Sequence, residues 1–227
     1  MEREKFLARV RTAAATGRAY RVHSRHDIPT DVGYVGAGKN PVERLAKEVN
    51  LSGGQSCIVN DDAEAKVELA KLIAHYHVKS ALCWQHPLLV RLQLDKFLAE
   101  RLVTELNYRN LCEVDPSQRR GQWLAADIGI TSVWHAVAET GTLAMAAGKE
   151  RERVASLLPP VHVAIVDRSQ ILPDLFDLFV AIEREYAGHL PSNLVLITGP
   201  SKTGDLELKL TTGVHGPGNW HVIVIDR

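Results

Sequence analysis

Short apolar runs alternate along this chain with longer segments in which apolar residues recur at helical spacing. Buried strands are predicted for the runs at 56–59, 78–84, 161–166, 194–198 and 222–225. Helices are predicted at 41–50, 61–75, 87–106 and 173–186. Strands that alternate with helices favour a mainly parallel sheet with helices on its faces. The sequence therefore predicts an α/β domain of three layers with a mostly parallel sheet.

Local signals support several of these elements. Asn40 is a good N-cap, Pro41 suits the first helical position, and Glu43 suits the first turn. The helix that begins after Pro173 is predicted to be held in the core by one apolar stripe, which consists of Leu175, Leu178, Phe179, Ile182 and Tyr186. Residues 107–123 are predicted to form a polar connection.

The N-terminal region has a different character. Residues 2–16 are predicted to form an amphipathic helix, and residues 16–40 an irregular arm rich in Gly, Pro, Asp and His. Gly36-Ala37-Gly38-Lys39 lacks the spacing of a phosphate-binding P-loop. The predicted organisation is an N-terminal helix and arm at 1–40, followed by one α/β domain at 41–227.

Composition excludes several classes of protein. Lys+Arg and Asp+Glu both number 27, so no overall charge favours nucleic acid or an anionic membrane. The N-terminus lacks a signal-peptide core and no apolar run is long enough to span a bilayer, so a cytoplasmic location is expected. Cys57, Cys83 and Cys112 lie far apart, which argues against a disulfide framework, a zinc ribbon or an iron–sulfur cluster in this chain.

The first candidate site is the sequence Glu139-Thr140-Gly141-Thr142, which follows the apolar run 133–138. Its acid and two hydroxyls surround a glycine that permits close approach of the backbone. Open α/β sheets place ligands outside the carboxyl ends of their strands. Glu139 is therefore a candidate nucleophile or general base, although a purely structural or ligand-binding use is also open.

The second candidate site is Thr198-Gly199-Pro200-Ser201-Lys202-Thr203, which follows a predicted strand and precedes a short helical pattern at 205–210. Backbone amides at a helix N-terminus attract anions, and the side chains of Ser201, Lys202 and Thr203 add donors and a positive charge. A carboxylate, phosphate or pyrophosphate is the expected ligand. The alternative is a capped helix start with a surface lysine.

Two histidines are candidates for a functional role. His215 lies between glycines on a predicted loop, where a functional imidazole is expected more often than in a strand. His162 enters a predicted strand, where a hydrogen-bonded packing role is favoured. Asp127 would form an acid/base pair with His215 if the fold brought the two together. The chain shows no helical metal-site spacing and no fingerprint for NAD, flavin or ATP, so no cofactor of its own and no metal are expected.

Five separated motifs in 124–226 together resemble the LUD domain family, of the lactate utilization protein C (LutC/YkgG) type. The first motif consists of the two segments 126–131 and 138–143. The other four motifs are 156–163, 191–194, 198–207 and 213–217. The resemblance implies a fold like that of the NagB/RpiA/CoA-transferase group. It also implies a role in oxidising L-lactate to pyruvate with iron–sulfur partner proteins, which are the LutA- and LutB-like lactate utilization proteins. Lys202 and Gly204 depart from the arginine and alanine expected there.

Three functions remain open from the sequence. In the favoured one, the chain is a LUD-domain component of a lactate-oxidising system. Glu139 and His215 are then the candidate catalytic residues, and the residues that bind a small carboxylate or anion are Thr140, Gly141, Thr142, Thr198, Gly199, Ser201, Lys202 and Thr203. The alternatives are a self-contained acyl- or CoA-transferring enzyme that uses Glu139, and a non-catalytic regulatory or scaffold subunit.

Overall fold

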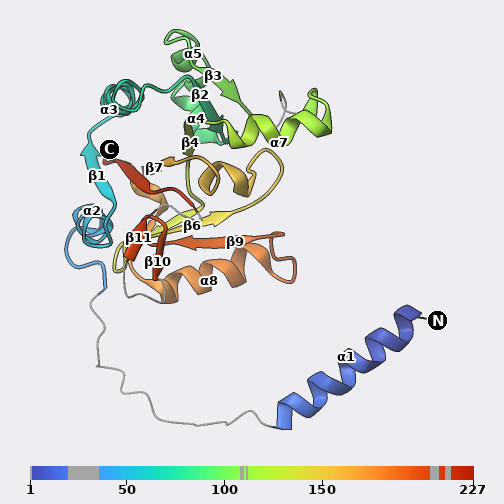
Figure 1. The fold of residues 1–227 in the computed structure, drawn as a ribbon. Coiled ribbons are helices and arrows are strands. Elements are labelled where there is room, and N and C mark those ends of the chain that lie inside the picture. The colour runs from blue at the N-terminus through green and yellow to red at the C-terminus, as the bar shows by residue number, and fades with distance from the viewer. Residues whose placement is uncertain (1, 20–35, 108–109, 111, 205–209, 213–215) are drawn as a thin grey trace. The chain divides into compact units, whose positions relative to one another are not determined.

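A computed structural model describes residues 2–19, 36–107, 110, 112–204, 210–212 and 216–227 (Figure 1). The chain divides into two units, residues 1–34 and 35–227. In the first unit, helix α1 (Glu2–Ala19) confirms the predicted N-terminal helix. No helix in the described ranges combines the length and the apolar character needed to cross a bilayer.

The second unit is built on a six-stranded sheet in which every neighbouring pair is parallel. Its spatial order is β1 (Gln55–Val59), β12 (Asn219–Ile225), β7 (Val161–Asp167), β4 (Ile128–Thr131), β2 (Ser80–Cys83) and β3 (Thr104–Leu106). Strand β7 is buried along its whole length, as its mostly apolar sequence predicts for a central parallel strand. The predicted α/β fold with a mostly parallel sheet is confirmed.

Helices α2 (Pro41–Leu51) and α3 (Asp62–His75) both pack against strands β1 and β12. Both begin at side-chain caps, since Asn40 accepts from the amides of residues 42 and 43, and Asp61 from those of residues 63 and 64. Helices α4 (Pro87–Arg91), α5 (Leu94–Ala99) and α7 (Pro116–Leu124) follow further along the chain (Figure 1).

A second, four-stranded sheet adds a layer that was not predicted. Its order is β8 (Ile171–Leu172), β5 (His135–Val137), β6 (Thr142–Ala146) and β9 (Leu194–Ile197), and β6 is antiparallel to both neighbours. Ala136, Leu143 and Met145 join the main core, while Val137 and Ala144 pack with Leu178 of α8 (Leu175–Tyr186). In Figure 1, β6 and β9 accordingly lie between the parallel sheet and α8.

The predicted helix at 87–106 is wrong, because the segment forms α4, α5 and then strand β3. Gln93 and Leu102 have φ angles of 51° and 58°, which interrupt a right-handed helix at both positions. Leu102 is also 91% exposed, so its apolar side chain supports no helical stripe. After it, residues 104–106 pair with β2.

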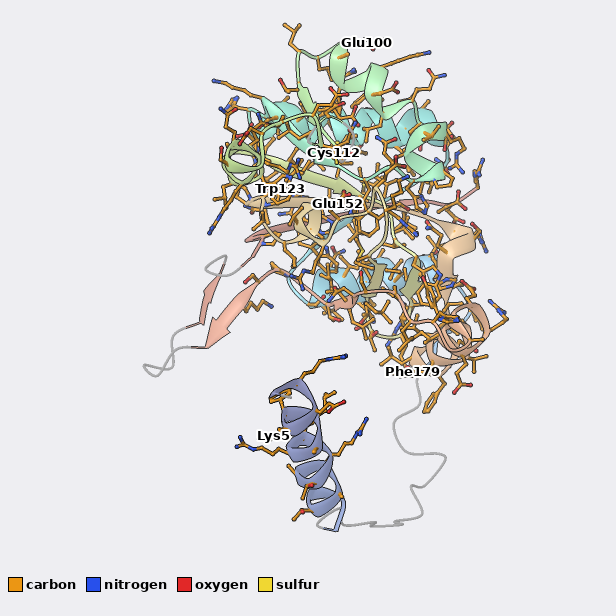
Figure 2. The ribbon with its side chains drawn as sticks, turned by 90° about the vertical axis from the view of Figure 1, so that its right-hand side faces the viewer. Lys5, Glu100, Cys112, Trp123, Glu152 and Phe179 are labelled. Carbon is orange, nitrogen blue, oxygen red and sulfur yellow. The ribbon has the colours of Figure 1, made fainter. Side chains whose placement is uncertain are left out.

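Two smaller predictions also fail. The polar connection at 107–123 contains α7, whose N-cap Asp115 accepts from the amide of Ser117 at 2.8 Å. Phe179 of α8 is 56% exposed and points away from the sheets (Figure 2). Only the narrow face of α8 that carries Leu178 and Ala181 is fully buried, because the sheet beneath it is small.

Candidate functional site

A cavity of about 240 Å³ lies over the first residues of β7 and β12. It is lined by His162 of β7 and Trp220 of β12, by Ser156 and Leu157 at the end of the 3-10 helix η1 (Arg153–Ser156), and by residues 195–201. Gly216 and Pro217 complete the lining. We call it the His162 cavity.

Glycines on either side make room for this arrangement. His162 is the register partner of both Trp220 and Gly129, so all three positions face the same side of the sheet. A Cβ on Gly129 would overlap the carbonyl oxygen of Ala155. Because glycine has no Cβ, η1 can pack directly on β4. A Cβ on Gly54 would overlap the benzo ring of Trp220. The glycines therefore set the positions of the helix and the indole that flank His162.

His162 is fully buried, and its Nε2 lies 2.9 Å from the hydroxyl of Thr131. Burial, followed by repulsion from His221, lowers the pKa of His162 to about 3, so the imidazole is neutral. Among the described residues, its Nδ1 has no hydrogen-bond partner, and neither has Nε1 of Trp220, which is 2% exposed. Buried polar atoms are usually paired, so these two buried nitrogens are exceptions among the described residues.

Three of the predicted threonines form a continuous chain of hydroxyls. The Oγ1 atoms of Thr140 and Thr142 are 2.7 Å apart, as are those of Thr142 and Thr198. Thr198 also lines the His162 cavity, together with Gly199 and Ser201. The structure thus joins the two candidate segments of the sequence at Thr198.

Glu139 and Gly141 lie in the turn between the antiparallel strands β5 and β6, and not at the end of a parallel strand. The reason is that the run before Glu139 belongs to the second sheet. Gly141 packs on α2, where an added Cβ would come within 2.7 Å of the amide nitrogen of Val49. A carboxylate oxygen of Glu139 accepts from the amide of Gly36 at 3.1 Å. Arg44 donates to the Glu139 carbonyl at 3.4 Å.

Lys202 does not follow a strand into a helix, because Lys202–Gly204 is strand β10, which pairs with β11 (Leu210–Thr212). The helical pattern predicted at 205–210 is not found at its last residue, because Leu210 lies in β11. The ammonium of Lys202 donates to the carbonyl of Ser52 at the end of α2, at 2.7 Å. Residues 205–209 and the side chain of Thr203 lie outside the described part of the chain.

His215 also lies outside the described residues, so its predicted pairing with Asp127 stays a prediction. Asp127 itself has a clear structural role. One of its carboxylate oxygens accepts from the amides of Lys79 and Ser80 at 2.8 and 2.9 Å and from the Ser80 hydroxyl at 3.1 Å. This carboxylate joins the beginnings of β2 and β4.

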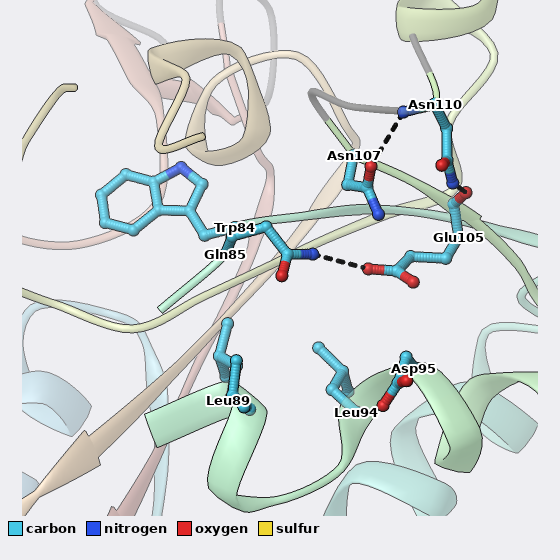
Figure 3. Close-up of a pocket in the computed structure, with 9 residues that line it drawn as sticks. Trp84, Gln85, Leu89, Leu94, Asp95, Glu105, Asn107 and Asn110 are labelled. Atoms are coloured by element: carbon cyan, nitrogen blue, oxygen red, sulfur yellow. Dashed lines mark hydrogen bonds between the residues drawn. The ribbon is translucent and has the colours of Figure 1, made fainter. Parts of the chain in front are cut away.

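A second cavity, of about 560 Å³, lies at the opposite edge of the sheet, outside the carboxyl ends of β2 and β3 (Figure 3). Gln85 donates to Glu105 at 3.2 Å, and the side chains of Asn107 and Asp95 are further polar lining groups. This cavity is not predictable from the apolar spacing, because the residues of β3 fall within the helix predicted at 87–106. Among the described residues, two carboxylates line it and no Lys or Arg does.

Charged side chains near the end of β7 form ion pairs with one another. Asp167 at the end of β7 accepts from Ser169, Arg91 and Arg227, and Arg91 also pairs with Asp62. Burial raises the pKa of Asp167, but the Ser169 and Arg91 hydrogen bonds outweigh it and hold the pKa at about 2. In the described ranges, no group of three or more His, Cys, Asp and Glu side chains is arranged to hold a metal ion.

Comparison with known proteins identifies the family. The model of the LUD domain matches residues 42–225. The chain belongs to the LUD domain family. The His162 cavity and the threonine chain both lie within this LUD domain, and α1 precedes it.

Two curated relatives align with nearly the whole of this LUD-domain chain, and a third aligns with less than half of it. A lactate utilization protein C of Halalkalibacterium halodurans is 27% identical, covering 99% of this chain and 98% of the relative. Its counterpart in a Geobacillus strain is 27% identical over 99% of this chain and 96% of the relative. Lactate utilization protein C of Bacillus subtilis is 38% identical over 45% of this chain and 44% of the relative.

A crystal structure of a DUF162 family protein from Deinococcus radiodurans shares the fold. Its TM-score is 0.58 at 18% identity, covering 82% of this chain and 96% of the solved one.

Proposed function

We propose that this LUD-domain protein is a component of an L-lactate utilization system, in which L-lactate is oxidised to pyruvate together with iron–sulfur partner proteins. The observation that carries the proposal is the match to two lactate utilization C proteins over 98% and 96% of their lengths. Oxidation of lactate to pyruvate releases two electrons and two protons. In this proposal the electrons pass to iron–sulfur clusters in the partner chains.

The proposed ligand region runs from the turn at Thr140 to the loop at Ser201. The hydroxyls of Thr198 and Ser201 are available at the His162 cavity to orient a small carboxylate. Glu139 and His215 remain the proposed groups that hold or move a proton. A carboxylate in such a role must lie within hydrogen-bond reach of the transferred proton.

The proposal is tested by gentle affinity purification of the full chain from its native cell. Iron is quantified and lactate-dependent dye reduction is assayed before and after the partner proteins are removed. We expect iron, partner proteins and activity to be recovered together, and activity to be lost from the isolated chain. A chain that is recovered alone, free of iron and inactive toward lactate contradicts the proposal.

The role of Glu139 needs its own test. Glu139→Gln keeps the size of the side chain and an oxygen that can accept from Gly36, but removes the charge and the basicity. We expect this variant to fold normally and to reduce lactate-dependent growth when it replaces the native chain. The matched control is Glu185→Gln on the exposed side of α8, which should support full growth. Full growth with Glu139→Gln eliminates a catalytic role for Glu139.

A further inference from the structure

We propose that the cavity outside the carboxyl ends of β2 and β3 binds a neutral vicinal diol, the group presented by a free sugar or by the ribose of a nucleoside. We call it the Asn107 cavity. Its volume of about 560 Å³ lies within the roughly 300–1,000 Å³ that is usual for small-molecule sites. Open α/β sheets place ligands at this end of their strands. The inference does not depend on the proposed role in lactate utilization.

The side-chain amide of Asn107 offers a hydrogen to this cavity. Asn107 follows β3 directly, and its Oδ1 accepts from the backbone amide of Asn110 at 3.0 Å. This bond fixes the orientation of the amide, so Nδ2 is its free end. Among the described residues Nδ2 has no hydrogen-bond partner, although Asn107 is only 7% exposed. Neighbouring atoms do not seal this nitrogen off, and in Figure 3 it points toward Gln85 and Glu105.

Gln85 and Glu105 supply acceptors beside that donor. Gln85 Nε2 donates to Glu105 Oε1 at 3.2 Å, which leaves the amide oxygen of Gln85 and the second carboxylate oxygen of Glu105 for a ligand. The backbone amide of Gln85 donates to the carbonyl of Glu150 at 2.9 Å and so holds this wall in place. The carboxylate of Asp95 on α5 is a further acceptor.

This combination of groups discriminates between classes of ligand. A hydroxyl both donates and accepts, so one member of a vicinal pair can accept from Asn107 while the pair donates to Glu105 and Gln85. An ammonium group only donates, which leaves the buried nitrogen of Asn107 unpaired at a cost. A ligand carboxylate only accepts and has no hydrogen to donate to Glu105. Two neighbouring hydroxyls satisfy the donor and the acceptors together.

An apolar wall faces the polar one and suits the carbon skeleton of such a ligand. Leu89 of α4 and Leu94 of α5 lie across the cavity from the polar side chains (Figure 3). They are 2% and 4% exposed, so both are held firmly in the core. Trp84 also lines the cavity, and its indole nitrogen is fixed by donation to the carbonyl of Glu152 at 2.9 Å. The C–H groups of a sugar ring, or the face of a base, fit against these side chains.

The test is calorimetric titration of the full-length protein with D-ribose, D-glucose, adenosine and dideoxyadenosine, which lacks both ribose hydroxyls. We expect at least one diol to bind, and dideoxyadenosine to bind at least tenfold more weakly than adenosine where adenosine is the ligand. Binding of a free sugar identifies a sugar site, whereas binding of adenosine without ribose or glucose identifies a nucleoside site. If none of the diols binds, or if only the cationic probe spermidine binds, the inference is overturned.

Two conservative variants locate the binding. Asn107→Asp keeps the oxygen that accepts from Asn110 but replaces the free donor by an acceptor. Glu105→Gln keeps the size of the side chain and an oxygen for Gln85, but turns the free acceptor into a donor. Each should weaken binding of the diol about tenfold or more, as the loss of a hydrogen bond to a charged or buried group predicts.

Matched controls lie outside the cavity. Asn219→Asp at the exposed start of β12 and Glu100→Gln, whose side chain is 74% exposed, should leave the affinity unchanged. If a cavity variant fails to fold, as judged by circular dichroism, Val90→Trp serves as a second probe, because Val90 lines the cavity and is 62% exposed. It should obstruct binding, whereas Val67→Trp at another exposed valine should not. Unchanged affinity in the folded cavity variants would place the ligand elsewhere and overturn the assignment.

Discussion

The buried imidazole of His162 makes the stability of this fold depend on pH. In the folded chain the pKa of His162 is about 3, since burial and the nearby His221 disfavour the charged form. An exposed histidine in the unfolded chain has a pKa of about 6.5. Between these values the unfolded state binds more protons, so stability contributed by this group is present at neutral pH and is lost as the pH falls.

The size of the effect follows from the two pKa values. Each unit of pKa difference corresponds to about 1.4 kcal/mol, so a drop from 6.5 to about 3 corresponds to roughly 5 kcal/mol over the whole range. Between pH 7 and pH 5, only the unfolded histidine titrates appreciably, and the expected loss is about 2 kcal/mol. His162→Gln removes the titration while an amide remains near Thr131.

Urea unfolding at pH 7 and pH 5 measures this difference. We expect the free energy of unfolding to fall by about 2 kcal/mol more in the native chain than in His162→Gln, with equal m-values. Other groups, such as His86 with a pKa of about 4, contribute equally to both proteins and cancel. Equal losses in the two proteins would show that His162 is hydrated or charged in the folded state, and would refute the reasoning.

Three further predictions concern the scaffold, each measured by urea unfolding against the native chain. Gly129→Ala should lower the free energy of unfolding by about 3 kcal/mol or more, because the new Cβ overlaps the Ala155 carbonyl; a change below 1 kcal/mol would contradict the tight packing of η1. Asp127→Ala should cost about 1–3 kcal/mol, because it leaves the amides of Lys79 and Ser80 without their acceptor; an unchanged midpoint would contradict this role. Leu102→Gly should raise the free energy of unfolding by roughly 0.5–1 kcal/mol, since φ is 58° at an exposed side chain; destabilisation would show that the leucine contributes to packing.

The central strands were predictable because their apolar composition indicates burial. Residues 163–166 of β7 and 222–225 of β12 consist of Val, Ile and Ala, and a sheet that is covered on both faces is needed to bury such runs. Helix α2 was predictable for a local reason, since Asn40 and Pro41 fix its beginning. In each case the cause lies within a few residues of the element.

The errors have causes that are distant in the sequence. The apolar spacing through Leu94 and Leu98 continues smoothly toward Leu106, and no Gly or Pro marks the positive φ at Leu102, which lies beyond the end of α5. Strand β3 exists only because β2 offers it a free edge. In the same way, Lys202 was read from the local order of strand, hydroxyls and lysine, while its actual partner is the Ser52 carbonyl, 150 residues earlier in the chain.

The His162 cavity was hidden for a related reason. A single histidine in an apolar strand carries no sequence signal that separates a packing role from a binding role. The distinction comes from register, which aligns His162 with Trp220 and Gly129, and from the glycines that admit the indole and η1. Thr198 and Ser201, which were predicted from the sequence to bind an anion, line this cavity together with His162 of β7 and Trp220 of β12.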